Sequence, residues 1–122
     1  MNDDQFQELT AALKTGEVRA VDALRSYQWA ALKATSRLNC VCQFIGEAEM
    51  WAAECDSMPQ VERASRPLHG LPISVKDNVS VQGYVVTAGS PKLVSGQDSS
   101  GCRPCESDAL VVKLIKVIYI QW

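Results

Sequence analysis

The segment from Pro67 to Asn78, with the sequence PLHGLPISVKDN, constrains this chain more than any other. It places Lys76 at the end of a short apolar run, after a Gly-Leu-Pro turn and directly before Asp77 and Asn78. The residues Ile73 to Val75 predict a short strand that would bury the lysine stem beside it. Burial disfavours the ammonium form of a lysine and lowers its pKa, which is how a lysine becomes a general base. Lys76 is therefore the first candidate for a catalytic residue.

The bulk composition is that of an ordinary globular chain and limits it to at most one domain. Its 122 residues are 47% hydrophobic and 21% charged, and the net charge is -2. No long run of one sign is present, so we expect no nucleic-acid partner bound through a broad basic surface. One histidine and scattered acids also predict no metal and no cofactor. No apolar stretch reaches the roughly 20 residues that a membrane-spanning helix needs.

Five cysteines are present, at positions 40, 42, 55, 102 and 105. Their number is odd and the polar N-terminus does not resemble a secretory signal, so free thiols in a reducing, cytoplasmic location are the simplest interpretation. A second interpretation uses the Cys102-Arg103-Pro104-Cys105 spacing, which is typical of redox motifs and could join Cys40 and Cys42 in a zinc site. A loop-like stretch precedes Cys102, whereas a thioredoxin-type motif opens a helix directly after a strand. The free-thiol interpretation is therefore favoured.

Apolar spacing predicts four helices. The first carries Phe6, Leu9, Ala12 and Leu13 and ends at Gly16, and the second covers about 21–37. The third covers about 47–57, with acids at its start and Pro59 after its end. The last begins after the capping pair Ser107 and Asp108. Its predicted buried face consists of Leu110, Val111, Leu114, Ile115 and Ile118.

Strands are predicted at 40–45 and 73–75, where short apolar runs are rich in β-branched and aromatic residues. The residues 79–87 alternate weakly and fit a short strand or a loop. The charged segment 60–67 and the Gly-, Ser- and Pro-rich segment 88–105 are expected to be loops. Because helices and strands alternate, the predicted class is α/β with a mainly parallel sheet.

Several of these segments resemble the amidase signature family, which hydrolyses carboxamides. The lysine motif from Leu68 to Asn78 is similar to the motif of that family almost position by position. Weaker likenesses follow in the right order, at 9–18, 38–41, 87–90 (Thr-Ala-Gly-Ser) and 108–112. The resemblance covers about residues 6–117, and 118–122 form an atypical tail. It implies that 1–122 is a partial amidase domain, the N-terminal portion of that α/β fold, truncated.

Two branches of the family stay open. Asn39-Cys40-Val41, followed by Glu47 and Cys55-Asp56, is similar to the fatty-acid amide hydrolases. The lysine motif also resembles the amidase subunit of the glutamyl-tRNA amidotransferases. In either case the resemblance implies a small amide substrate for the full-length form. Homodimerisation and membrane association of that form stay open as well.

The resemblance assigns Lys76 as the base of a Ser-cisSer-Lys triad. In such a triad a neutral lysine takes a proton, through a bridging serine with a cis peptide bond, from the serine that attacks the amide. The Gly- and Ser-rich stretch that carries both serines in the family has no counterpart in this chain. Ser90, Ser99 and Ser100 are candidate nucleophiles by residue type alone. We therefore expect a fragment that is inactive by itself, or one that acts only by binding a full-length relative.

Three neighbours of Lys76 in the motif need an interpretation. His69 could act as an acid or a base, but it precedes the strand in a turn, and a structural role is favoured. Asp77 and Asn78 are expected to shape the turn after the strand, because both side chains readily bond the local backbone. A supporting role for this pair toward the lysine is the alternative.

Overall fold

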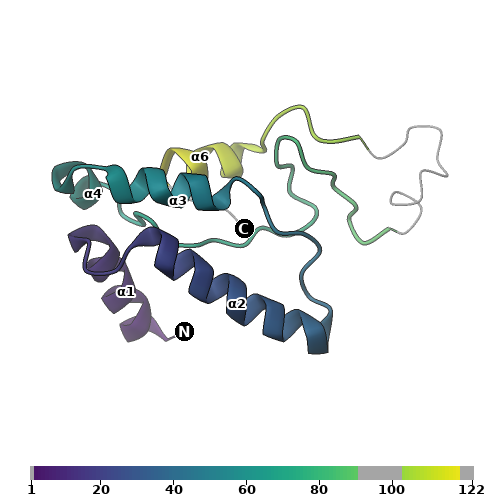
Figure 1. Ribbon diagram of the computed structural model, residues 1–122. Coiled ribbons are helices and arrows are strands. Elements are labelled where there is room, and N and C mark those ends of the chain that lie inside the picture. Colours follow the sequence, from purple (N-terminus) through teal and green to yellow (C-terminus); the bar gives the residue numbers. More distant parts are fainter. Residues whose placement is uncertain (1, 91–102, 119–122) are drawn as a thin grey trace. The chain divides into compact units, whose positions relative to one another are not determined.

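A computed structural model describes residues 2–90 and 103–118, and for 115–118 it describes the backbone alone (Figure 1). The chain divides into two compact units. The first comprises residues 1–74 together with 118–122, and the second comprises residues 75–117. Each unit is described by itself below.

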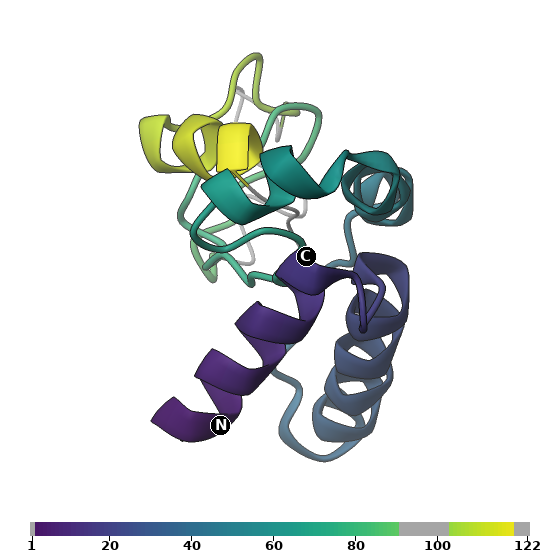
Figure 2. The same cartoon turned by 90° about the vertical axis from the view of Figure 1, so that its left-hand side faces the viewer.

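The first unit is helical. It contains α1 (Asp3–Thr15), α2 (Ala20–Leu38), α3 (Ala48–Ser57) and α4 (Gln60–Ser65). Helix α2 packs along α3, and α1 packs against α4 (Figures 1 and 2). Their facing sides bury a core of leucine and alanine side chains, which includes Leu13, Ala20, Ala23, Leu24, Ala48 and Ala52. Small residues at these positions let the helix backbones approach closely.

Local signals set the ends of α1. The amide of Gln5 donates to Asn2 Oδ1 at 2.9 Å, and the amide of Asn2 donates to Gln5 Oε1 at 3.0 Å, which makes a reciprocal capping box. The helix ends at Gly16, whose φ of 81° lies in the left-handed region that favours glycine. The predicted first helix and its stop at Gly16 are confirmed.

Helix α2 has no cap from its own preceding residue. Arg19 occupies the N-cap position and makes no side-chain capping bond. Instead, the carboxylate of Asp56, in α3, accepts the amide of Ala20 at 2.6 Å and that of Val21 at 3.2 Å. Arg19 Nε lies 3.6 Å from the same carboxylate. A negative charge at this position satisfies amides that the helix leaves unpaired and complements the helix dipole. Asp56 therefore joins α2 to α3.

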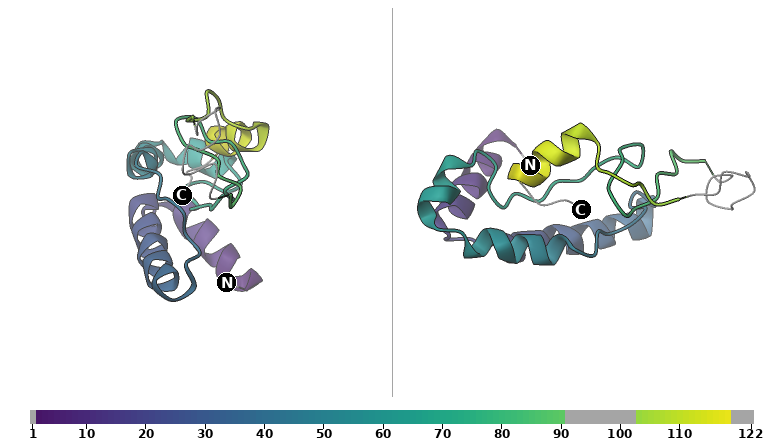
Figure 3. Two further views of the ribbon diagram at one scale, coloured as in Figure 1. Left: turned by 90° about the vertical axis from the view of Figure 1, so that its right-hand side faces the viewer. Right: turned by 90° about the horizontal axis from the view of Figure 1, so that it is seen from above.

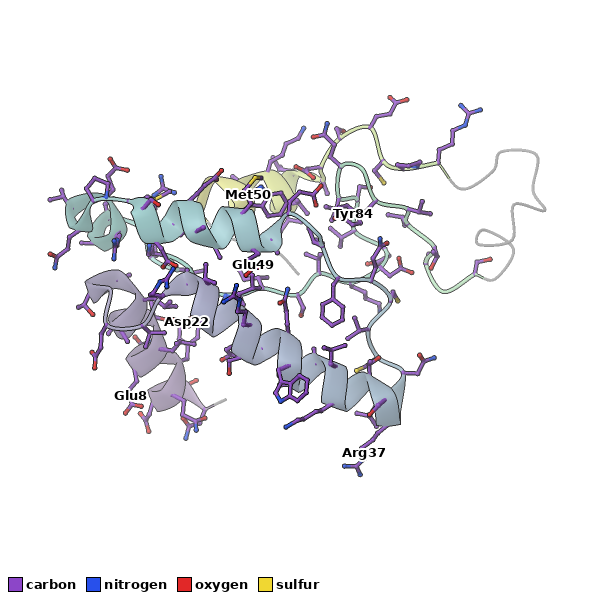
Figure 4. The ribbon with its side chains drawn as sticks, in the orientation of Figure 1. Glu8, Asp22, Arg37, Glu49, Met50 and Tyr84 are labelled. Atoms are coloured by element: carbon purple, nitrogen blue, oxygen red, sulfur yellow. The ribbon has the colours of Figure 1, made fainter. Side chains whose placement is uncertain are left out.

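Two arginines add further links within the first unit. Arg63, in α4, donates to the carbonyl of Asp56 at 2.7 Å and to that of Met58 at 2.6 Å, so it fixes the turn between α3 and α4. Arg25 of α2 pairs with Glu49 of α3. Figure 4 shows Glu49 on the side of α3 that faces α2. Both members of the second pair are more than half exposed, so it contributes little to stability.

The structure corrects the prediction of a loop at 60–67, because residues 60–65 form α4. Pro59 was interpreted only as the end of the preceding helix. It also begins the next one, since its carbonyl accepts the amides of Glu62 and Arg63 at 3.0 and 3.1 Å. Proline is well suited to a helix start, where its missing N–H is not needed.

The second unit is mostly irregular backbone, followed by α6 (Leu110–Ile118). Gln82 and Cys105 form a parallel bridge. It is extended by bonds from the amide of Gly83 to the carbonyl of Cys105 at 2.9 Å, and from the amide of Cys105 to the carbonyl of Tyr84 at 2.8 Å. Asp108, which precedes α6, accepts the amide of Gln82 at 2.7 Å. Figure 3 gives two further views of the helices.

The predicted sheet is wrong for the part of the chain that the structure describes. Residues 40–45 are irregular, and β pairing is confined to single bridging residues, such as Ile73 and the pair of Gln82 and Cys105. A strand needs a neighbour that pairs with its backbone, and a locally favourable composition does not supply one. The helical predictions at 21–37 and 47–57 are confirmed by α2 and α3.

The predicted buried face of α6 is also wrong where its side chains are described. Val112 is fully buried, whereas Leu110, Val111 and Leu114 are 73%, 49% and 55% exposed. The side chains of Ile115 and Ile118 lie outside the described residues. The helix is mostly apolar, so its composition does not reveal which side faces inward.

Candidate functional site

Lys76 lies at the start of a tight turn in the second unit. The amide of Val79 donates to the carbonyl of Lys76 at 2.9 Å, and this bond closes the turn. The lysine side chain is exposed. Among the residues that the structure describes, its ammonium has no ion-pair partner within 4.0 Å. The burial that the sequence predicts for Lys76 is therefore not provided by the described part of the chain, because the strand expected to cover it has no paired neighbours.

Asp77 ties this turn to a second turn ten residues later. Its carboxylate accepts the amide of Thr87 at 3.2 Å, the Thr87 hydroxyl, and the amide of Gly89 at 3.4 Å. Its backbone carbonyl accepts the amide of Ala88 at 3.3 Å. The Thr87 hydroxyl and amide hold the pKa of the Asp77 carboxyl below its ordinary value. The lysine motif and the Thr-Ala-Gly-Ser run are thus joined through one side chain.

The second turn has an uncommon backbone. The amide of Ser90 donates to the carbonyl of Thr87 at 2.8 Å, which closes the turn. Ala88 has a φ of 47° and Gly89 a φ of 73°, both in the left-handed region. Ser90, one of the candidate nucleophiles, therefore follows the turn that Asp77 anchors. Ser99 and Ser100 lie outside the described residues.

Of the Asp77-Asn78 pair, it is Asp77 that makes the contacts. Asn78 is exposed within the turn. The expectation that both side chains bond the local backbone is therefore met by Asp77, although with a turn ten residues away rather than with its own. Thr87 is the residue whose role the sequence did not reveal. Its hydroxyl is an available donor beside a Gly, but nothing in the local sequence indicates which acidic residue it meets.

His69 belongs to the first unit and is 1% exposed. Its Nδ1 has no hydrogen-bond partner among the described residues. Burial lowers the pKa of His69, and the nearby positive charges of Arg63 and Arg66 lower it further. A hydrogen bond with the Cys55 backbone and the charge of Asp56 act in the opposite direction. His69 is therefore a buried, neutral side chain within the packing of the first unit.

We predict that acidification destabilises the first unit through His69. Because its folded pKa lies below the unfolded value near 6.5, the unfolded chain binds the proton first as the pH falls. The stabilising contribution is complete above pH 6.5, declines as the pH falls below that value, and is gone at the folded pKa. The decline is at most about 1.4 kcal/mol per pH unit for one group. Urea unfolding at about pH 7 and about pH 5.5 measures it.

His69 is the one histidine in the chain, so few other groups titrate in that interval. The matched variant is His69→Gln, which keeps a polar side chain but cannot take up the proton. We expect its unfolding midpoint to stay nearly constant between the two pH values, whatever its absolute stability. An equal pH dependence in the variant and the parent would contradict the assignment to His69.

The described cysteines are free thiols. Cys40 and Cys42 are exposed, Cys105 is half-buried, and Cys55 is buried. Burial raises the pKa of the Cys55 thiol, against a smaller opposing effect of Arg66. Within the described ranges no group of three or more His, Cys, Asp and Glu side chains is arranged to hold a metal ion. Cys102, the first member of the predicted redox motif, lies outside those ranges.

No helix within the described residues combines the length and the apolar character that crossing a membrane requires.

Comparisons with known proteins place these features in a family. The profile of the family described as Amidase matches residues 22–116. Over 85 residues the chain is 36% identical to fatty acid amide hydrolase 1 of Caenorhabditis elegans, an alignment that covers 69% of this chain and 15% of that protein. Over 98 residues it is 34% identical to a glutamyl-tRNA(Gln) amidotransferase subunit of Treponema denticola, covering 76% and 20%.

A solved structure shares the fold. It is titled as an inhibitor-bound vestigial protein complex that reveals the evolutionary origins of an s-triazine catabolic enzyme. The match has a TM-score of 0.77 at 23% identity and covers 95% of this chain and 24% of that one. The chain thus spans about a fifth of the length of these proteins. The family profile extends over most of the sequence, including the whole lysine motif, and the chain belongs to the amidase family.

Proposed function

We propose that this chain supplies the lysine-bearing part of an amidase that hydrolyses carboxamides, and that Lys76 is its general base. The observation that carries the proposal is the anchored turn: Lys76 stands in a family motif whose next residue is bonded to the Thr-Ala-Gly-Ser run. A base must be held in a defined position to accept a proton in the transition state. The exposure of Lys76 leaves its side chain available for contact with other residues.

The chemistry requires partners for this lysine. A serine hydroxyl is a weak nucleophile until an adjacent base removes its proton. In the proposed mechanism Lys76 takes that proton through a bridging serine, while the nucleophilic serine forms an acyl intermediate with the amide carbon and the amine leaves. Backbone amides near the nucleophile would stabilise the oxyanion. Both serines, and the residues that desolvate Lys76, would come from the part of an amidase that this chain does not match.

Fatty-acid amides are the substrate class that we propose to test first, following the likeness at Asn39–Val41, Glu47 and Asp56. The structure gives two of these residues roles in folding. Asn39 ends α2 in the left-handed conformation, and Asp56 caps the start of α2. A role in a tRNA-dependent amidotransferase is the alternative, since the chain is about equally identical to members of both branches.

A non-catalytic role is the second candidate. Leu110, Val111 and Leu114 leave much of α6 exposed and apolar, which favours association of this chain with another polypeptide. In this role the 122-residue chain would act by binding a full-length relative, without turnover of its own.

A serine-reactive probe tests the proposed function. We expect a fluorophosphonate to leave the purified 122-residue chain unlabelled, with no hydrolysis of oleamide or of short amides, because the chain lacks the Gly- and Ser-rich stretch of the family. We expect the same probe to label the complete protein, encoded by a reading frame that continues beyond Lys116 into such a stretch. Labelling of Ser90, Ser99 or Ser100 in the chain by itself would contradict the proposal.

A further inference from the structure

Three successive backbone amides converge on Asp77. The amide of Thr87 lies 3.2 Å from Oδ1, that of Gly89 lies 3.4 Å from Oδ2, and that of Ala88 lies 3.3 Å from the backbone carbonyl. The Thr87 hydroxyl donates to Oδ2 as well. Successive amides in a turn with left-handed residues form a concave site for an anion. In this chain the anion is the carboxylate of Asp77.

The turn that provides these amides carries strain. Ala88 has a φ of 47°, which is unfavourable for a residue with a Cβ and costs about 1–2 kcal/mol. Its methyl group has no polar atom with which to offset this cost. The bonds to Asp77 on both sides of Ala88 compensate for it instead. Strained backbone of this kind persists where the surrounding contacts enforce it, and it is often found at functional sites.

On this basis, and resting on the proposed function, we propose that Asp77 is a positioning residue for Lys76. The two residues share a peptide bond, and the turn that begins at Lys76 is anchored by the Asp77 side chain. Asp77 does not act as the ion-pair partner of Lys76, because its carboxylate is directed at residues 87–89. It holds the backbone from which the lysine projects. A displacement of about 1 Å at a catalytic group can lower the rate roughly 100-fold.

Thr87 is the partner that makes the anchor specific. It contributes two of the four bonds, one through its amide and one through its hydroxyl. A valine at this position keeps the shape of the side chain but has no hydroxyl, whereas a serine keeps the hydroxyl and loses a methyl group. The pair of variants therefore separates hydrogen bonding from packing.

Amide exchange in the 122-residue chain tests the anchor without any catalysis. We expect Asp77→Asn to increase the hydrogen-exchange rates of the Thr87 and Gly89 amides at least about tenfold, because the side-chain amide presents donors where the carboxylate presents acceptors. Thr87→Ser should exchange as the parent does. Glu106→Gln, which neutralises an exposed carboxylate in the same unit, is the matched control. Unchanged exchange at 87–89 in Asp77→Asn would overturn the inference.

Steady-state kinetics of the complete amidase test the positioning role. We expect Asp77→Asn to lower kcat roughly 10- to 100-fold with KM within about twofold, and Thr87→Val to follow in the same direction. Thr87→Ser should restore near-parental kcat, and Glu106→Gln should leave it unchanged. A kcat per folded molecule equal to that of the parent in Asp77→Asn would overturn the inference.

Lys76→Ala in the same preparation separates the two proposals. If Lys76→Ala is inactive while Asp77→Asn turns over normally, the positioning role alone fails. If Lys76→Ala retains full turnover, the proposed function fails, and the positioning role fails with it.

Discussion

Lys76→Ala is expected to lower kcat/KM for amide hydrolysis by the complete enzyme about 10³-fold or more. Without the base, no group in the motif can take the proton that leaves the nucleophilic serine. The folded state should be almost unaffected, because Lys76 is exposed and forms no ion pair within the described residues. Hydrolysis rates, together with circular dichroism and the thermal midpoint, measure the two effects separately.

Two further variants sharpen this prediction. Lys76→Arg keeps the positive charge but should be as inactive as the alanine variant, since a guanidinium stays protonated and cannot act as a base. Lys113→Ala removes an exposed lysine from α6 and should retain parental activity. Turnover of Lys76→Arg near that of the parent would show that the charge, rather than proton transfer, is what the position requires.

Gly70→Ala is expected to lower the free energy of unfolding by about 2–4 kcal/mol. Gly70 has a φ of 66°, where a side chain is strained. A Cβ at this position would also lie 2.9 Å from the Cβ of Ala20 and 3.5 Å from Leu13 Cδ2. Ala20 and Leu13 are 1% and 2% exposed, so neither can move aside easily. Urea unfolding followed by tryptophan fluorescence measures the change.

Gly83→Ala is the matched control for this prediction. Gly83 also has a positive φ, of 82°, but a Cβ there would meet nothing within 4 Å. We expect it to cost about 1–2 kcal/mol, the conformational part alone. The difference between the two variants then reports the contact with α2. Equal losses would mean that the segment around Gly70 yields to accommodate the methyl group.

The helices could be predicted because their signals are local. An apolar stripe of period 3.6 marks α2, and Gly16 marks the end of α1. The predictions failed where structure depends on a distant partner. The segment 40–45 has the composition of a strand but no pairing neighbour among the described residues. Likewise, Val112 rather than Leu110 is the buried residue of α6, and a mostly apolar helix gives no sign of this.

The candidate site shows the same division. The motif around Lys76 is contiguous and identifies the lysine directly. The bonds from Asp77 to Thr87 and Gly89 connect residues ten and twelve positions apart without any regular element between them. No periodicity or spacing rule predicts such a pairing. The exposure of Lys76 likewise depends on what surrounds the turn rather than on the residues within it.

The cap on α2 has a consequence for the order in which the chain can fold during synthesis. The carboxylate of Asp56 reaches the amide of Ala20 across 36 residues of sequence. At ribosomal rates of 5–20 residues per second, about 2–7 seconds separate the synthesis of the first turn of α2 from the synthesis of its cap. During that interval α2 has no side-chain cap, and its N-terminal amides must be satisfied by water. Completion of α3 therefore finishes two helices at once, and the nascent chain gains α2 and α3 as a pair rather than in succession.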